Sequence, residues 1–313
     1  MDSPVISIVL PTYNGSRYIR KSVDSCLQQS FADFELILVN DCSTDDTASI
    51  LEEYVKKDAR VRVINNAFNK KLPLSLNAGF ESATGKYFTW TSDDNFYAPS
   101  ALQKMWEVLE KDSNIDLVYA DYTLIDDKDK IFGVRKFGDV NKSFNRWLGA
   151  GACFLYKKEI HRANNGYNPA AFLIEDYDFF VRAFIKFRFQ YLPLADLYYY
   201  REHAASLTST QNTAINDISK IFLERNLAGL EKKLSPQELK LLYRKLAIYF
   251  SVYKNNASKY KWYLGRISSI SMGETAITVL YVCIQKLWNA VYLGFSGIVQ
   301  FFILLFTKTD KKP

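Results

Sequence analysis

The sequence predicts an α/β protein with a doubly wound, mostly parallel sheet and a helical C-terminal extension. Short apolar runs alternate with amphipathic helical segments through the first third of the 313-residue chain. Runs such as ISIVL and ELILV are apolar at every position, as in strands that helices cover on both faces. Strands and helices that alternate in this way are joined by right-handed crossovers into a parallel sheet.

The expected elements follow in the order strand, helix, strand, helix. Strands are expected at 5–10, 34–40, 61–64 and 87–91, and helices at 17–29, 44–57, 74–82 and 99–111. Ser43 or Thr44 is expected to cap the second helix. Further strands are expected at 117–122, 151–156 and 195–202, and a helix at 174–187. Helical character prevails from 213 to 257, with a helix start at Pro236 after Ser235.

Polar, turn-forming residues follow four of the expected strands. These segments are PTYN at 11–14, DCSTDDT at 41–47, NNAFNKK at 65–71 and SDDN at 92–95. Because the carboxyl ends of parallel strands share one edge of a sheet, the four segments are expected to converge. The sequence therefore predicts a ligand site at this edge.

Two acidic positions at this edge each allow two interpretations. Asp93 and Asp94 either cap the next helix and face solvent, or hold Mg²⁺ or Mn²⁺, which binds carboxylate oxygens together with phosphate. Asp41 either forms a turn with Asn40 and Ser43, or accepts a hydrogen bond from the imide N–H of a pyrimidine base.

Composition narrows the function and the location. The net charge of +6 is not gathered into a basic run, which disfavours nucleic acid as a partner. The 22 Phe, 21 Tyr and 5 Trp suit surfaces that face a sugar or a membrane as well as a thick core. The four cysteines show no metal or redox spacing, and the N-terminus lacks a signal-peptide pattern. A cytoplasmic location is expected, at the cytosolic face of a membrane.

Four ordered segments together resemble glycosyltransferase family 2. They lie at 6–47, 75–102, 166–183 and 198–208, and the resemblance extends over roughly 4–210. It implies an inverting nucleotide-sugar transferase of the GT-A fold. The implied organisation is a GT-A catalytic domain at 1–212, a helical extension at 213–270 and a hydrophobic C-terminal helix or helices at 271–313.

The resemblance implies a donor site at the ends of the first two strands. Pro11, Thr12, Tyr13 and Asn14 match the exit of the first strand, where the base and ribose of the nucleotide rest. Asp41 matches the acid that reads uracil.

The same resemblance implies roles for the later acids and a histidine. Asp93 matches a contact to the ribose or donor sugar, and Asp94 matches the metal-binding acid. Asp176, in IEDYD, matches the catalytic base, with Glu175 as its neighbour. His203 matches a residue that reaches the metal or the diphosphate. The alternatives are an acidic helix N-terminus around Asp176 and a hydrogen-bonded structural role for His203.

Three residues depart from the family pattern. Cys42 stands where glycine is frequent, Thr91 where a further acid is common, and Leu76 where arginine is frequent. These departures leave the identity of the donor open.

The implied activity is that of a hexosyl- or hexosaminyltransferase that depends on Mn²⁺ or Mg²⁺. The expected donor is a nucleotide sugar, with UDP-sugars favoured, and the expected acceptor is a hydroxyl of a glycan or lipid-linked glycan. The alternatives are another nucleotide-sugar enzyme and a non-catalytic scaffold that retains the fold. A nucleotidyltransferase is disfavoured because PTYNGSRY contains one glycine, Gly15, in place of a glycine-rich phosphate loop.

The C-terminal segment 287–306 is a 20-residue stretch without formal charge, which is the length of a bilayer-spanning helix. Trp288 and Tyr292 near one end and Lys308 beyond the other resemble interfacial anchors. Asn289, Ser296 and Gln300 interrupt the apolar run. The segment is therefore expected to span a membrane, to lie on one, or to pack within the protein or an oligomer.

Overall fold

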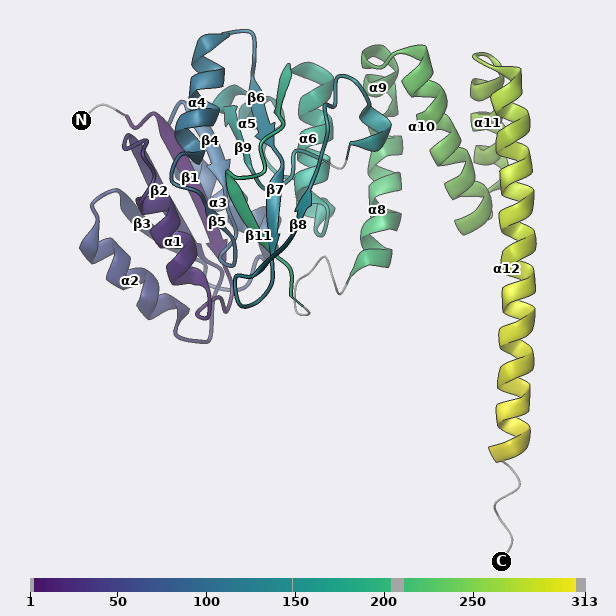
Figure 1. The fold of residues 1–313 in the computed structure, drawn as a ribbon, viewed down its shortest axis with the longest axis horizontal. Helices are drawn as coiled ribbons and strands as arrows, with labels where there is room; N and C mark the ends of the chain where they lie inside the picture. The colour runs from purple at the N-terminus through teal and green to yellow at the C-terminus, as the bar shows by residue number, and fades with distance from the viewer. Residues whose placement is uncertain (1–2, 148, 204–210, 308–313) are drawn as a thin grey trace, which may run out of the picture. The chain divides into compact units, whose positions relative to one another are not determined.

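The chain divides into two compact units, Met1–Leu230 and Glu231–Pro313. The computed structural model describes residues 3–147, 149–203 and 211–307, with side chains described in these ranges except at 212, 213 and 290–307. Figure 1 shows the strands gathered in the first unit and helices in the second.

A seven-stranded sheet, counted over the described residues, forms the centre of the first unit, in the order β10-β6-β9-β4-β1-β2-β3. Strand β9 is antiparallel to β4 and β6, and the other neighbouring pairs are parallel. The predicted doubly wound, mostly parallel sheet is confirmed. The strands are β1 (Ile6–Thr12), β2 (Phe34–Asn40), β3 (Val61–Asn65), β4 (Tyr87–Trp90), β6 (Leu117–Ala120), β9 (Phe154–Lys157) and β10 (Phe189–Leu192).

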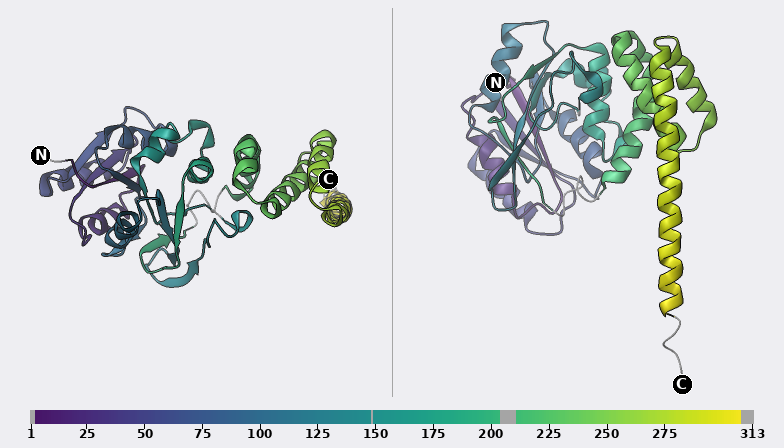
Figure 2. Two further views of the ribbon diagram at one scale, coloured as in Figure 1. Left: turned by 90° about the horizontal axis from the view of Figure 1, so that it is seen from above. Right: turned by 45° about the vertical axis from the view of Figure 1, so that its right-hand side comes forward.

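Helices cover the sheet, as Figures 1 and 2 show. Strands β1 and β2 are buried almost throughout, which is the reason for their continuous apolar sequences. Their central residues Ile8, Leu36 and Leu38 are fully buried. The helices of this unit are α1 (Ile19–Leu27), α2 (Thr47–Lys57), α3 (Lys71–Ser82), α4 (Ala101–Lys111), α5 (Lys158–Ala163), α6 (Glu175–Lys186) and α8 (Asn212–Arg225).

A second sheet of four strands, among the residues described, lies in the same unit, in the order β5-β11-β7-β8. Its strands are β5 (Phe96–Tyr97), β11 (Tyr198–Arg201), β7 (Tyr122–Ile125) and β8 (Ile131–Arg135). Because β5 directly follows the SDDN segment, this sheet joins the exit of β4 to β11.

Two predictions about the elements are wrong. The expected strand 117–122 is two strands in different sheets, because the carboxylate of Asp121 between them accepts hydrogen bonds from Phe137 N (2.9 Å) and the Tyr191 hydroxyl (2.7 Å). Helix α2 begins at Thr47 and not at 44, and neither predicted cap acts as one. Ser43 and Thr44 instead form hydrogen bonds with the loop that follows β1.

The second unit contains helices α10 (Pro236–Ile248), α11 (Ala257–Ser268) and α12 (Met272–Thr307), a π-helical turn at Tyr249–Tyr253, and most of α9 (Leu227–Lys233). Helix α10 contacts α11, and both contact α12. The predicted start of α10 is confirmed, since the Ser235 hydroxyl accepts from Glu238 N and Pro236 occupies the first turn. In the part of the chain that the structure describes, no helix combines the length and the apolar character that a membrane crossing requires.

Gly79 sets the distance between α3 and the sheet. A Cβ atom at this position would overlap Cγ1 of Val9 and lie 3.1 Å from Cγ2 of Val39. We expect Gly79→Ala to lower the stability of the first unit by about 1–3 kcal/mol, because both valines are buried and stiff at χ1.

Thermal unfolding of the first unit measures this effect, and Gly133→Ala is the matched control. A Cβ at Gly133 meets Leu124 at 3.5 Å, an ordinary contact distance. A Gly79→Ala protein as stable as Gly133→Ala would show that α3 packs less closely than described.

Candidate functional site

The exits of β1 and β2 lie side by side at the carboxyl edge of the main sheet. Asp41 N donates to the carbonyl of Thr12 at 2.9 Å. Two positions further along each segment, Asn14 N donates to the Ser43 hydroxyl at 3.0 Å, and Asn14 Oδ1 accepts from Thr44 N at 2.8 Å. The predicted convergence of these segments is therefore present, and reciprocal hydrogen bonds fix it.

The exit of β4 joins the same edge through Asp93. The hydroxyl of Thr12 donates to Oδ2 of Asp93 at 2.5 Å. A Cβ atom at Gly15 would overlap both of these side chains, so this position requires glycine. Burial, followed by the charge of Asp94, raises the pKa of Asp93 to about 7, and the hydrogen bond from Thr12 opposes this rise.

Asp94 and His203 form the second part of the cluster. Nε2 of His203 lies 3.2 Å from Oδ2 of Asp94. The other carboxylate oxygen of Asp94 accepts from the Ser92 hydroxyl at 2.7 Å. The fold thus brings together two predicted site residues that are 109 positions apart in the sequence.

The donor set of Asp94 and His203 fits a divalent cation. It offers one carboxylate oxygen and one imidazole nitrogen, and no group of three or more His, Cys, Asp or Glu side chains is close enough to hold a metal in the described part of the chain. Mg²⁺ is bound in proteins through one or two carboxylates, with water and substrate phosphates completing its coordination. A two-ligand site of this kind suits a cation that arrives with a diphosphate.

Arg201 is a site residue that sequence reasoning missed. Its side chain is 1% exposed, although it carries a permanent charge. Nε donates to the carbonyl of Asp94 at 3.0 Å, one terminal nitrogen to the carbonyl of Asp126 at 2.7 Å, and the other to Oδ1 of Asp129 at 2.5 Å. The guanidinium also lies over the ring of Tyr18, 4.4 Å from its centroid.

These contacts make Arg201 a positioning residue. Its backbone N–H donates to Asn95 Oδ1 at 2.7 Å, so both its main chain and its side chain hold the segment that carries Asp94. His203 follows two residues later. The only sequence signal was a charge at the end of the aromatic run YYYRE, which does not reveal partners that are mostly carbonyl groups.

Asp41 lies at the predicted edge, but other residues of the chain already use its carboxylate. It is 4% exposed and accepts from Lys70 N (2.8 Å), Lys71 N (2.9 Å) and the Asn66 side chain (2.8 Å). These bonds shape the loop that leads into α3. Asp41 therefore orders the loop after β3, and its contact with a base stays a prediction.

The four residues at the exit of β1 differ in exposure. Pro11 and Thr12 are buried in the strand, whereas Tyr13 is 50% exposed and Asn14 is exposed with a φ of 55°. Cys42 has a φ of 64°, the left-handed conformation that glycine adopts at least cost. The departure from glycine at position 42 therefore leaves the turn geometry in place at the cost of local strain.

A second pair of acids begins helix α6. Burial, followed by the charge of Asp176, raises the pKa of Glu175 to about 8. Burial also raises the pKa of Asp176, although Tyr177 N donates to Asp176 Oδ1 at 2.6 Å. Oε2 of Glu175 is buried without a hydrogen-bond partner among the described residues. The pair shares no hydrogen bond with Asp93, Asp94 or His203 in the described structure, so the predicted site residues form two separate acidic clusters.

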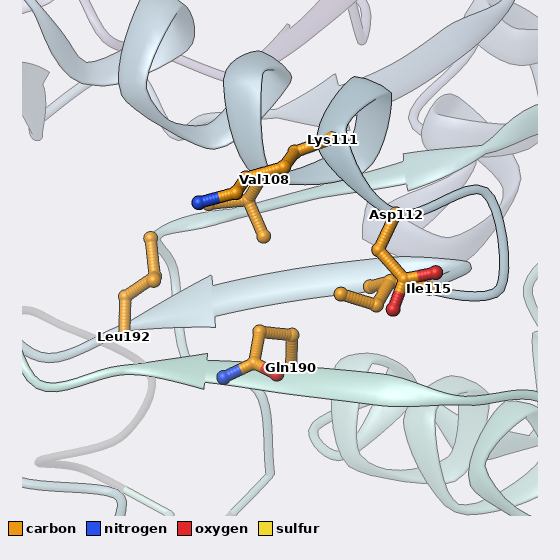
Figure 3. Close-up of a pocket in the computed structure, with 6 residues that line it drawn as sticks. All are labelled: Val108, Lys111, Asp112, Ile115, Gln190 and Leu192. Atoms are coloured by element: carbon orange, nitrogen blue, oxygen red, sulfur yellow. The ribbon is translucent and has the colours of Figure 1, made fainter.

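A surface hollow next to α4 does not involve these clusters. It is lined by Val108, Lys111, Asp112, Ile115, Gln190 and Leu192 (Figure 3). Its lining contains none of the predicted site residues, and it offers one carboxylate beside one lysine. The hollow therefore contains no pair of acids like those of the two acidic clusters.

Replacing Arg201 tests its positioning role. We expect Arg201→Lys to destabilise the fold by about 3–5 kcal/mol, because the charge stays buried while one ammonium group cannot reach three acceptors in different directions. Below the unfolding temperature, the variant is expected to bind Mn²⁺ more weakly, measured by calorimetry.

The control for this experiment is Arg135→Lys. Arg135 pairs with Glu202 at 2.9 Å on the surface, where both side chains are about 40% exposed. Such a pair contributes about 0–1 kcal/mol. Equal losses in the two variants would contradict the role assigned to Arg201.

Comparisons with known proteins agree with the geometry. The family model of glycosyl transferase family 2 matches residues 7–164. A glycosyltransferase of Rickettsia prowazekii (strain Madrid E) is 30% identical over 247 residues, which cover 76% of this chain and 74% of that protein. The glycosyltransferase EpsJ of Bacillus subtilis (strain 168) is 30% identical over 219 residues, which cover 66% of this chain and 63% of EpsJ.

Solved structures show the same fold. TarS (residues 1–349) of S. aureus in complex with UDP-GlcNAc superposes with a TM-score of 0.63 at 17% identity, covering 91% of this chain and 89% of that one. The mannosyltransferase PcManGT of Pyrobaculum calidifontis, in complex with GDP-Man and Mn²⁺, gives a TM-score of 0.56 at 15% identity, with 93% and 84% covered. The fold is GT-A, and the chain belongs to glycosyltransferase family 2 as a transferase enzyme.

Proposed function

We propose that this enzyme is a cation-dependent, inverting glycosyltransferase that moves a sugar from a UDP-sugar to a hydroxyl of a glycan or lipid-linked glycan. The observation that carries the proposal is the pairing of Asp94 with His203 at 3.2 Å, beside the Thr12–Asp93 contact at the carboxyl edge of the sheet. This edge is where open α/β sheets bind their ligands.

The proposed donor rests on the exits of β1 and β2. Tyr13 presents an exposed ring there, and Asn14 presents an exposed turn. TarS is solved with UDP and with UDP-GlcNAc, and PcManGT with GDP-Man, which supports a nucleotide sugar as the donor. We assign Pro11 to Asn14 and Asp41 to the nucleoside and Asp93 to the ribose or sugar.

Asp94 and His203 are the proposed holders of Mn²⁺ or Mg²⁺. When bound, the cation neutralises the negative charge that develops on the departing diphosphate. Asp94 is suited to this role because Ser92 and Arg201 fix its side chain and its carbonyl. The complex of PcManGT with Mn²⁺ supports a divalent cation as the cofactor.

Asp176 is the proposed general base. The acceptor hydroxyl loses its proton to the Asp176 carboxylate while its oxygen bonds to the anomeric carbon from the face opposite the diphosphate. The bond between the anomeric carbon and the diphosphate oxygen breaks in the same step, and the nucleoside diphosphate leaves with the electron pair. Such direct displacement inverts the anomeric centre. Because burial raises the pKa of Asp176, the carboxylate is a stronger base than a free aspartate.

The proposed location is the cytosol, and the free cysteines support it. Cys26, Cys42, Cys153 and Cys283 are all free thiols, as expected in a reducing compartment. We place the enzyme at the cytosolic face of a membrane because a lipid-linked acceptor would be presented there.

The decisive experiment incubates the enzyme with Mn²⁺ and a panel of UDP- and GDP-sugars. We expect donor binding by the wild type, detected by calorimetry, and a loss of Mn²⁺-dependent binding in Asp94→Asn. If no sugar nucleotide binds to the wild-type protein with or without Mn²⁺, the proposed donor site is wrong.

Replacing Asp176 separates catalysis from binding. We expect Asp176→Asn to bind the donor within about twofold of wild type and to lower kcat by about 10²–10⁴, the usual contribution of a general base. Stopped assays of sugar transfer, with the sugar nucleotide that the binding panel identifies as donor, measure kcat. A variant with full kcat would remove Asp176 from the mechanism.

The raised pKa of Glu175 predicts a dependence of stability on pH. The folded chain binds this proton more tightly than the unfolded chain, so the contribution of Glu175 to stability falls as the pH rises from about 4.5 to about 8. Glu175→Gln removes this effect. The free energy of unfolding of Glu175→Gln minus that of wild type is expected to rise by on the order of 2–4 kcal/mol from pH 5 to pH 9. This follows from about 1.4 kcal/mol for each unit of pKa shift.

Urea unfolding at several pH values measures the gain. Glu52→Gln, on the exposed face of α2, is the control and is expected to follow wild type within about 0.5 kcal/mol. A pH-independent difference between Glu175→Gln and wild type would show that Glu175 is ionised in the folded protein at neutral pH.

A further inference from the structure

Strand β8 exposes apolar side chains at the edge of the second sheet. Ile131, Phe132 and Val134 are 59%, 54% and 48% exposed. Strand β8 pairs with β7 on one side and is the last strand of its sheet in the described structure, so its other backbone edge has no strand partner there (Figure 1). Long exposed apolar edges are uncommon in proteins that lack a partner for them.

Basic side chains surround these apolar ones. Lys128, Lys130 and Lys136 are exposed, and none of the three forms an ion pair within the described residues. Two nearby acids are already paired, since Asp127 contacts Arg17 and Asp129 contacts Lys21 and Arg201. The carboxylate of Asp126 accepts from the backbone N–H groups of Lys128 and Lys130. The exposed segment 127–136 therefore carries an excess of positive charge.

We propose that segment 127–136, the turn before β8 together with the strand, is a docking surface for an anionic lipid bilayer. Apolar side chains with lysines on either side of them are suited to a membrane interface, where the apolar groups enter the headgroup region and the lysines meet anionic headgroups. All six side chains are exposed, and the strand is the outermost one of its sheet among the described residues.

A second copy of this chain is a poorer occupant. Antiparallel pairing of two β8 strands about Gly133 would place Lys130 of each copy opposite Lys136 of the other. Like charges directly opposite each other destabilise a strand pair. The charge pattern therefore favours the anionic surface.

Hydrogen bonds of Arg201 connect the docking surface to the candidate active site. Arg201 holds the carbonyl of Asp126 and the carboxylate of Asp129 on one side and the carbonyl of Asp94 on the other. A bilayer bound at β8 would thus lie next to the metal-binding cluster. If the acceptor is lipid-linked, as the proposed function allows, this contact delivers it to the site.

Hydrogen–deuterium exchange of the full-length protein tests the proposal locally. We expect the amides of 127–136 to exchange at least about fivefold more slowly with phosphatidylglycerol vesicles than with phosphatidylcholine vesicles. A contact made elsewhere, such as at α12, would not protect this segment. The donor assay is independent of this readout, so either result can fail without the other.

Charge removal provides the matched comparison. A triple variant is expected to bind anionic vesicles through 127–136 about 100-fold more weakly, at roughly fivefold for each lysine near the surface. It combines Lys128→Gln, Lys130→Gln and Lys136→Gln. The control replaces Lys56, Lys57 and Lys111, which are exposed elsewhere, by Gln.

Three results would overturn the proposal. They are no protection of 127–136 by anionic vesicles, equal protection in the charge-removed and wild-type proteins, and protection that grows with protein concentration in the absence of vesicles. The last result would identify a second copy as the occupant.

Discussion

The candidate active site depends on one buried charge, the guanidinium of Arg201. A cation at 1% exposure is costly unless each of its donors finds an acceptor, and here Asp94, Asp126 and Asp129 supply them. These acceptors belong to two segments that are far apart in sequence, the exit of β4 and the turn between β7 and β8. Satisfying the charge therefore fixes the geometry of both, and the planar fork of arginine sets the directions in which they approach.

Asp41 performs a similar task on the other side of the same edge. Its carboxylate accepts three hydrogen bonds from residues 66–71, of which two come from backbone N–H groups. A carboxylate has about four acceptor positions, so one is left for a ligand. Ordering of the loop 66–71 is a role that neither interpretation of the sequence contained, and the contact of Asp41 with a base stays a proposal.

Most of the fold could be predicted from the sequence because buried parallel strands carry continuous apolar runs, and those runs also locate the strand exits where Asp93 and Asp94 lie. The break at Asp121 could not, because the acid interrupts an otherwise apolar run and its partners, Phe137 N and Tyr191, are distant in sequence. Arg201 could not be predicted either, since two of its three side-chain acceptors are carbonyls, which every residue possesses.

In each of the two acidic pairs, Asp93–Asp94 and Glu175–Asp176, two carboxyl groups are adjacent, but the groups around the two pairs differ. In both pairs burial and a neighbouring carboxylate oppose full ionisation. The carboxylate of Asp93 accepts a hydrogen bond from the Thr12 hydroxyl, which opposes the rise of its pKa, and Asp94 faces the imidazole of His203, the other proposed cation ligand. Oε2 of Glu175 has no partner among the described residues, so this pair lowers its energy by keeping a proton. In the proposed mechanism, the first pair holds the cation and the second pair accepts the proton of the acceptor hydroxyl.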